Sequence, residues 1–311
     1  MRTSTSSATT PAPAVPAGHA GQAGRISRVR LVLGIFKLRI AVLIMITALA
    51  GLAVVPEGRA TFVQALVLAL ATLLAAGSAG AFNQFFEASS DRLMARTRQR
   101  AFASGALPRS AGWLLAIVAI GAAAVAAAAW VVNGMAALFV ALGAITYAGV
   151  YTVGLKRRTP WNIVIGGLAG SFAVLAGAAA VNPAIGAPAW TLALVLFLWT
   201  PPHFWSLAIA NEAEYRAAGV PMLPVVVGAE RAARIVHWHA LALVAASFVL
   251  VPLGGGWPVA VGAAVGGLYF LRKTAALVRK QDRRTAMTAF FASMVQLSAL
   301  LAAVAVQAAL R

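Results

Sequence analysis

The sequence predicts an all-α, polytopic membrane protein, built as a bundle of nine transmembrane helices with the N-terminus in the cytoplasm. Three observations predict this fold class. Of the 311 residues, 61% are hydrophobic and 10% are charged, whereas roughly a quarter of the residues of a soluble domain are charged. Apolar segments near the ~20 residues that a bilayer core requires follow one another with short polar breaks. Basic residues gather in alternate loops.

Nine apolar segments follow in order, and each accounts for one predicted helix. Small residues crowd nearly all of them, as expected of helices that approach one another closely in lipid. The eighth segment is the weakest, because the stretch from Trp257 to Leu271 is short and rich in glycine. The approximate centres of the segments are Ala48, Ala71, Gly121, Leu142, Ala173, Leu196, Val244, Val265 and Leu297.

The sequence indicates one domain preceded by a tail. Residues 1–30 are rich in Ser, Thr, Ala, Pro and Gly, so we expect them to be disordered. This tail contains no apolar core of signal-peptide length, and no cleaved secretion signal is expected. We expect residues 31–311 to form a single transmembrane domain, because nothing in this stretch suggests a second one.

The distribution of Lys and Arg predicts the orientation. Of the 25 basic residues, all except Arg59 and Arg311 lie before the first span or in alternate loops on the same side. Positive residues mark the cytoplasmic side of a membrane. The N-terminus is therefore expected inside and the C-terminus outside. Abundant Arg and Ala favour the inner membrane of a bacterium, with the mitochondrial inner membrane as the less favoured alternative.

Charge and cysteine content exclude several classes of function. The net charge is +18, but the basic residues sit between membrane spans and lack a soluble domain to arrange them, so no nucleic-acid partner is expected. An anionic membrane surface and an acidic substrate remain as partners. The chain has no cysteine, which excludes disulfides, thiol nucleophiles, iron–sulfur clusters and cysteine zinc sites.

The stretch "NQFFEASSD" at the end of the second segment carries the most informative polar residues. Asn83, Glu87 and Asp91 lie four apart, so on a helix they share one face. Two carboxylates and an amide form a hard oxygen-donor site, which suits Mg²⁺ completed by phosphate and water. The alternative is an ordinary helix end that surfaces into water with polar residues.

Two cationic clusters accompany this acidic face. Arg92, Arg96, Arg98 and Arg100 follow it directly, and residues 156–158 form a second cluster two spans later. Cations beside a carboxylate–metal site suit a polyanion that bridges both, and Arg matches phosphate oxygens bidentately. The alternative for each cluster is plain positive-inside topology.

A third polar patch lies in and after the sixth segment. Glu212, Glu214 and Tyr215 follow the segment, and the two-residue spacing of the acids means that only one faces the centre. His203 lies inside the segment, where ionisable groups are functional hypotheses by default. The alternative is a neutral histidine that is hydrogen-bonded to a carbonyl group.

These motifs resemble a known family. "NQFFEASSD" resembles the N-x-x-x-D-x-x-x-D motif of the UbiA-type intramembrane prenyltransferases, although Glu87 stands where the family usually has Asp. Within that superfamily, "RRTPWNIVIGGLAG", "WTPPHFW" and "EYRAAGVPMLPVV" resemble the protoheme IX farnesyltransferases, also called heme O synthases. The resemblance extends from about Lys37 to the last span.

The resemblance implies a bundle around a central cavity, and transfer of farnesyl from farnesyl diphosphate to a vinyl group of heme B with hydration, giving heme O. Heme is then a substrate, and Mg²⁺ is the cofactor. The lipid bilayer and a heme O-using enzyme or terminal oxidase assembly are the further partners implied. The implied catalytic residues are Asn83, Glu87 and Asp91, which bind the metal together with Glu214. The implied substrate-binding residues are Lys37, Arg39, Arg96, Arg98, Lys156, Arg157, Arg158, Asn162, His203, Glu214 and Tyr215.

Two other functions compete with this interpretation. A prenyltransferase acting on a small aromatic quinone precursor would share the acidic face, but it has no reason to carry "TPPHFW". A transporter suits intramembrane glycines and broken helices. However, the acids here cluster at one cytoplasmic edge, and most spans are uncharged at their centres.

Overall fold

The computed structural model describes residues 28–311, and these residues form helices joined by short loops. The predicted all-α class is confirmed. In chain order the helices are α1 (Arg28–Ile35), α2 (Leu38–Val54), α3 (Phe62–Phe86), α4 (Ala88–Asp91), α5 (Ala101–Ser104), α6 (Ala111–Val131), α7 (Gly134–Ile145), the π-helix η1 (Thr146–Leu155), α8 (Asn162–Gly166), α9 (Leu168–Val181), α10 (Ala187–Ala210), α11 (Glu212–Ala217), α12 (Leu223–Val227), α13 (Ala229–Val249), the π-helix η2 (Val251–Gly255), α14 (Gly256–Arg279) and α15 (Arg283–Ala309).

Among the described residues, eight helices are long and apolar enough to cross a membrane, or nine if the bent pair α1–α2 counts as one span. All nine predicted centres fall within these helices, which confirms the polytopic prediction. The eighth span is longer than predicted, because α14 continues from the glycine-rich stretch to Arg279. The first span is instead the irregular one, with a 50° bend between its two helices.

The expected tail is only partly described. The first helix begins at Arg28, so the last three residues of the tail predicted from composition, 28–30, are helical. The rest of that tail, residues 1–27, lies outside the described residues.

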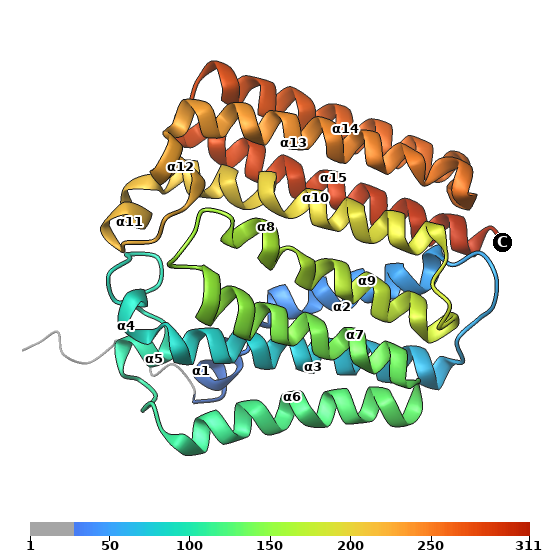
Figure 1. Cartoon of the computed structure of the whole chain (residues 1–311), viewed down its shortest axis with the longest axis horizontal. Helices are drawn as coiled ribbons and strands as arrows, with labels where there is room; N and C mark the ends of the chain where they lie inside the picture. Colours follow the sequence, from blue (N-terminus) through green and yellow to red (C-terminus); the bar gives the residue numbers. More distant parts are fainter. Residues whose placement is uncertain (1–27) are drawn as a thin grey trace, which may run out of the picture.

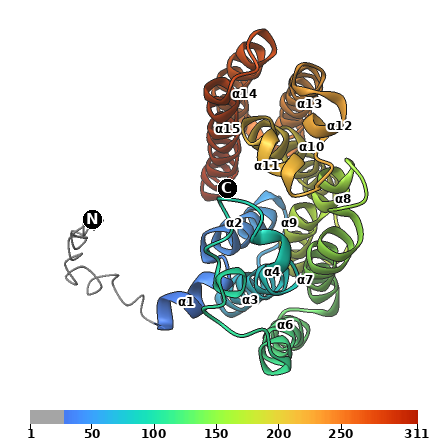
Figure 2. The same cartoon turned by 90° about the vertical axis from the view of Figure 1, so that its left-hand side faces the viewer.

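Successive long helices run antiparallel along the bundle (Figure 1). The segments 87–110, 156–161, 211–228 and 280–282 meet at one end, on the left in Figure 1. We call this the basic end, because these segments and the helix ends beside them carry most of the basic residues. The C-terminus lies at the opposite end (Figure 1). In the view onto the basic end, α4 and α11 lie in front of the ends of the long helices (Figure 2).

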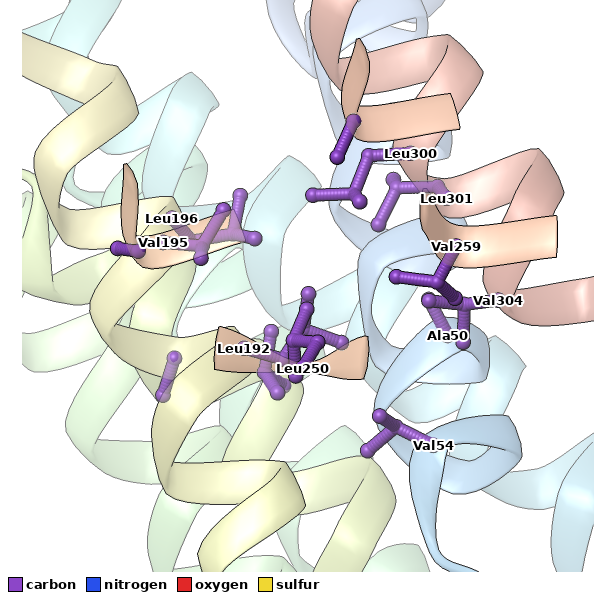
Figure 3. Packing of buried hydrophobic residues seen from close by; sticks show 14 of the residues in the cluster. Ala50, Val54, Leu192, Val195, Leu196, Leu250, Val259, Leu300, Leu301 and Val304 are labelled. Atoms are coloured by element: carbon purple, nitrogen blue, oxygen red, sulfur yellow. The ribbon is translucent and has the colours of Figure 1, made fainter. Parts of the chain in front are cut away.

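A large hydrophobic cluster occupies the half of the bundle opposite the basic end. It joins α2, α9, α10, α13, α14 and α15 mainly through buried Leu, Val and Ala side chains. Figure 3 shows Leu192 beside Leu250, and Ala50 beside Val259 and Val304. A second hydrophobic cluster lies toward the basic end, but the buried carboxylates of the described residues, Glu87 and Asp91, also lie there. The central cavity that the resemblance implies stays a prediction.

Two glycines set the distance between α2 and α9. A Cβ atom at Gly51 would collide with the Val174 carbonyl oxygen, and one at Gly177 would collide with the Ala48 carbonyl oxygen. The two backbones therefore touch directly at this crossing. Such close approach is what small residues permit between helices in lipid.

Candidate active site

The acidic face predicted from sequence is present at the basic end. Asn83 lies in the last turn of α3, Glu87 follows that helix, and Asp91 ends α4. The helical path continues through the junction, since the Glu87 amide donates to the Asn83 carbonyl and the Asp91 amide to the Glu87 carbonyl, each at 2.9 Å. The Asn83 amide group also donates to Glu87 Oε2 at 2.8 Å. All three residues are buried, with 2–3% exposure.

Each of these three residues is paired with a cation. Lys37 Nζ donates to Asn83 Oδ1, and Lys156 Nζ donates to Glu87 Oε2, both at 2.5 Å. The guanidinium of Arg100 donates to the two oxygens of Asp91 at 3.0 and 2.8 Å. The structure therefore brings together residues from three stretches of the chain that are far apart in the sequence, at Lys37, at residues 83–100 and at Lys156.

Lys37 reaches the site because the first span bends there. Its φ is 48°, and it is the only non-glycine residue with positive φ among the described residues. This left-handed conformation is costly for a lysine and persists only where its surroundings enforce it. Gln84, the neighbour of Asn83, donates to the carbonyl groups of Gly34 and Ile35 at 3.0 and 3.1 Å, so α3 holds the bend in place.

The π-helix η1 forms the wall beside the acidic face. Its wider turn places Tyr147 and Tyr151 in a stack with ring centroids 5.6 Å apart. Thr152 accepts from the Asn83 amide at 3.1 Å and donates to the Tyr147 carbonyl at 2.8 Å. The Tyr147 hydroxyl accepts from Lys37 at 3.2 Å. Such widened turns inside helices are frequent at functional sites.

Asn162 has a positioning role in this structure. It is fully buried, and its amide donates to the carbonyl groups of Thr159 and Lys156 at 2.6 and 3.4 Å. The residue thus fixes the loop that carries Lys156. Its Oδ1 atom is buried without a hydrogen-bond partner.

The helix α11 adds a further carboxylate at the same end. Glu214 Oε2 is buried without a hydrogen-bond partner. Its neighbour Tyr215 accepts from Arg96 at 3.3 Å, and burial raises the pKa of the Tyr215 phenol against the opposing effect of Arg96. Glu212 instead forms an ion pair with Arg216 at 2.5 Å. Of the two acids, it is therefore Glu214 that has an oxygen free and buried.

His203 belongs to a different cluster, between α10 and α15. Its ring stacks between Trp199 and Phe290, with centroids at 4.2 and 4.4 Å. Its Nδ1 lies 2.7 Å from the Ser293 hydroxyl, which itself donates to the Phe290 carbonyl at 2.6 Å. Because that hydroxyl has a single proton, Nδ1 is the donor to Ser293, and Nε2 is left as an acceptor.

Four of the cations named from sequence are not brought into the site. Their side chains are exposed and form no ion pair with described residues; they are Arg39, Arg98, Arg157 and Arg158. Arg100 was predicted only as one of the arginines that follow the acidic face, and Tyr147 and Thr152 were not predicted as site residues. The i, i+4 spacing of Tyr147 and Tyr151 on the approach to Lys156 could have indicated the aromatic wall.

The donor set fits a single Mg²⁺ ion by its chemistry. Two carboxylates and an amide oxygen share one face, and the unpartnered Glu214 Oε2 is a further hard donor at the same end. Mg²⁺ usually takes one or two carboxylates and completes its octahedron with phosphate and water. Within residues 28–311, no three His, Cys, Asp or Glu side chains are grouped so as to hold a metal alone.

The fold and the site define a class of protein: a polytopic helical membrane protein with buried acids and cations at one end of the bundle, suited to a polyanion and its metal ion. The sequence profile of the UbiA prenyltransferase family matches residues 44–296. The chain therefore belongs to this family of prenyltransferases.

Within this family, the chain is similar to proteins named protoheme IX farnesyltransferase. The chain is 52% identical to protoheme IX farnesyltransferase 2 of Paramagnetospirillum magneticum, over 88% of this chain and 95% of the relative. It is 40% identical to protoheme IX farnesyltransferase of Gloeobacter violaceus, over 87% of this chain and 89% of the relative.

Solved structures agree on the fold. A digeranylgeranylglyceryl phosphate synthase superposes with a TM-score of 0.71 at 16% identity, covering 90% of this chain and 98% of that chain. A UbiA homolog from Archaeoglobus fulgidus, bound to DMAPP and Mg²⁺, superposes with a TM-score of 0.69 at 15% identity, covering 86% of this chain and 98% of that chain. The predicted UbiA-type fold is confirmed.

Proposed function

We propose that this protein transfers a farnesyl group from farnesyl diphosphate to a vinyl group of protoheme IX (heme B), with hydration, to give the hydroxyethylfarnesyl side chain of heme O. The observation that carries the proposal is the 52% identity, over 88% of the chain, to a protoheme IX farnesyltransferase. The paired acids and cations at the basic end supply the groups that such a reaction needs.

The diphosphate is proposed to bind at the basic end, between the acidic face and its cations. Lys156 and Arg100 lie beside Glu87 and Asp91 and would bind the phosphate oxygens, with Arg96 on the side of Tyr215. Asn83, Glu87, Asp91 and Glu214 would hold Mg²⁺, which supplies Lewis-acid stabilisation of the charge that grows on the departing diphosphate. The four exposed arginines outside the site, which are Arg39, Arg98, Arg157 and Arg158, would attract the polyanion at longer range.

The residues around the diphosphate make its departure favourable. The bond between farnesyl C1 and the diphosphate oxygen breaks, and the electron pair leaves with the diphosphate. Fixed cations of Lys156 and Arg100 stabilise this developing charge without reorganisation at the moment of reaction. The Tyr151 ring lies beside Lys156, and the Tyr147 ring, which stacks on it, lies beside Lys37; aromatic faces of this kind attract cations, including the allylic one that forms.

The acceptor, a vinyl group of heme B, then reacts with the allylic cation. The π electrons of a heme vinyl group form the new carbon–carbon bond to farnesyl C1. Water adds to the resulting carbocation and loses one proton, which leaves a hydroxyl group on the heme side chain. The apolar walls of the bundle exclude water from the allylic cation until this step.

His203 is proposed to lie beside the iron of the bound heme. Its Nε2 atom is an acceptor because Nδ1 carries the proton, and a neutral imidazole nitrogen of this kind binds iron. It suits a heme propionate poorly, because a carboxylate requires a donor. His203 lies seven residues before the end of α10, which places it about 10 Å from the basic end at the helical rise per residue.

The proposed location is the cytoplasmic membrane of a bacterium, with the basic end and the active site on the cytoplasmic side. The concentration of basic residues at this end supports the orientation. The proposed product, heme O, would pass to a heme O-using enzyme or to a terminal oxidase assembly.

The proposal is tested with the purified protein, heme B, farnesyl diphosphate and Mg²⁺, by reading the products by mass. A farnesylated and hydrated heme that disappears in the Asp91→Ala variant establishes both the reaction and the acidic site. If heme gives no product but an added aromatic acid is prenylated, the protein acts on a quinone precursor instead.

A further inference from the structure

The oxygens proposed to hold the metal are already paired with positive side chains. Lys156 contacts Glu87 at 2.5 Å, and Arg100 contacts Asp91 at 2.8 Å. The carboxylate side chains are 3% and 5% exposed, whereas those of Lys156 and Arg100 are 17% and 25% exposed. The cations thus retain contact with solvent, and the carboxylates lie deeper in the protein.

The balance of charge opposes binding of the metal alone. The two cations cancel the charges of the two carboxylates, and Asn83 Oδ1 also accepts from the ammonium group of Lys37. A metal ion that took Glu87 or Asp91 would leave Lys156 or Arg100 without its counter-charge in a partly buried site, which is strongly unfavourable. A diphosphate that arrives alone meets the converse obstacle, because both cations are already occupied.

Simultaneous arrival of the two ligands removes both obstacles. Lys156 and Arg100 can exchange their carboxylates for phosphate oxygens, which a guanidinium binds bidentately. Glu87 and Asp91 can then exchange their cations for the metal. Every charge keeps a partner in the completed exchange. The partial exposure of the two cations lets them turn without opening the hydrophobic clusters.

We infer that the ion pairs Lys156–Glu87 and Arg100–Asp91 make the diphosphate and the divalent metal bind as one unit. Each ligand releases the groups that the other needs, so each raises the affinity of the other, and by linkage the two effects are equal. Arg100 thereby becomes a further diphosphate-binding residue. The inference rests on the proposed function, because it takes a prenyl diphosphate and a divalent metal as ligands.

The test measures Mn²⁺ binding to the purified full chain by electron paramagnetic resonance. Titrations are made with and without farnesyl thiodiphosphate, an unreactive analogue, and are corrected for the metal–analogue complex in solution. We expect the analogue to raise the affinity of the wild type for Mn²⁺ about 5–150-fold, the range typical of coupled sites.

Two variants and two matched controls assign the effect to the ion pairs. Lys156→Met and Arg100→Met each free one carboxylate, so Mn²⁺ alone should bind at least about 5-fold more tightly than in the wild type, and the effect of the analogue should shrink. Lys273→Met and Arg272→Met remove the same charges from α14, outside the site. These controls should keep the coupling of the wild type.

Equal affinity of the wild type for Mn²⁺ with and without the analogue overturns the inference, and this measurement requires no variant to fold. Unchanged metal-only affinity in folded Lys156→Met and Arg100→Met protein overturns it as well. The assay contains no heme, so its outcome is separable from the proposed function. If the protein forms farnesylated heme but Mn²⁺ and the analogue bind independently, the inference about the ion pairs is wrong and the proposed function stands. If Mn²⁺ and the analogue raise each other's affinity but heme gives no product, the proposed heme reaction is wrong and the inference stands.

Discussion

The imidazole of His203 donates its Nδ1 proton to the Ser293 hydroxyl at 2.7 Å, and this hydroxyl donates onward to the Phe290 carbonyl. Trp199 and Phe290 cover the two faces of the ring. Phe204 also meets the ring edge to face, at 5.2 Å between centroids, and Nε2 has no hydrogen-bond partner among the described residues. The sequence placed a histidine at membrane depth, and the structure adds which nitrogen it offers.

Replacement of His203 by alanine is therefore expected to remove an iron ligand. The His203→Ala variant should bind heme B at least about tenfold more weakly, and the Soret band of the heme–protein mixture should return to that of free heme. Binding of Mn²⁺ with farnesyl thiodiphosphate should be unchanged, because that site lies at the basic end. The measurement is a heme titration followed by absorption spectroscopy.

The matched control for this prediction is His239→Ala. The Nδ1 atom of His239 lies 3.0 Å from the Ile235 carbonyl one turn earlier in α13, so the residue has a local partner. This variant should keep the wild-type spectrum. Identical spectra for wild type and His203→Ala contradict the assignment of His203.

Glu87 offers a direct test of charge in the acidic face. Glu87→Gln keeps the shape of the side chain but leaves the Lys156 ammonium without its counter-charge. We expect kcat/KM for farnesyl transfer to fall about 10²–10³-fold, the usual size of a lost electrostatic contact in a transition state. The rate is measured by the mass of the heme product.

The companion variant Glu87→Asp separates charge from length. Aspartate is the residue that the family motif usually has at this position, and it shortens the reach to Lys156 by one methylene group. Activity should remain within about tenfold of the wild type, because a carboxylate is still present to pair with a cation or metal. Equal losses in both variants would mean that the length of the side chain matters as much as its charge, which would contradict this expectation.

Hydropathy predicted the fold well, because burial in lipid imposes long apolar helices on any sequence that spans it. The bend at Lys37 could not be predicted in this way. Its left-handed φ of 48° depends on Gln84, which donates to the carbonyl groups of Gly34 and Ile35 from a helix about fifty residues later. The residues around Lys37 alone do not predict that contact.

The site was predictable where helical spacing determines it. The four-residue spacing of Asn83, Glu87 and Asp91 placed them on one face, and they lie together in the structure. The positions of the individual basic residues could not be predicted in this way, because composition does not distinguish Arg98, which is exposed, from Arg100, which folds back onto Asp91. The path of the loop after α4 makes that difference.

The crossing of α2 and α9 gives a stability prediction. Gly177→Ala would push a methyl group into the Ala48 carbonyl, so the two helices must separate. We expect a loss of about 1–3 kcal/mol in the free energy of unfolding, as for other overpacked sites. The measurement is the melting temperature of the protein in detergent, which should fall.

Gly170→Ala is the control on the same helix. An added Cβ at Gly170 meets nothing within 4 Å, and alanine is favoured over glycine inside a helix by roughly 0.5–1 kcal/mol. This variant should melt at the same temperature or higher. A lower melting temperature in both variants would show that α9 tolerates no added methyl group, and that the contact with α2 is not the cause.

The orientation can be tested because the chain has no cysteine. A single cysteine introduced as Lys280→Cys lies in the exposed turn between α14 and α15 at the basic end, and one introduced as Arg59→Cys lies in the exposed α2–α3 loop at the opposite end. In right-side-out membrane vesicles, a membrane-impermeant maleimide should label Arg59→Cys and leave Lys280→Cys unlabelled. Detergent should then expose both positions, which controls for the reactivity of each thiol.

The reverse pattern before detergent would place the acidic face, its cations and the diphosphate site on the outer side. It would contradict the positive-inside rule for a chain with nearly all its basic residues on one side.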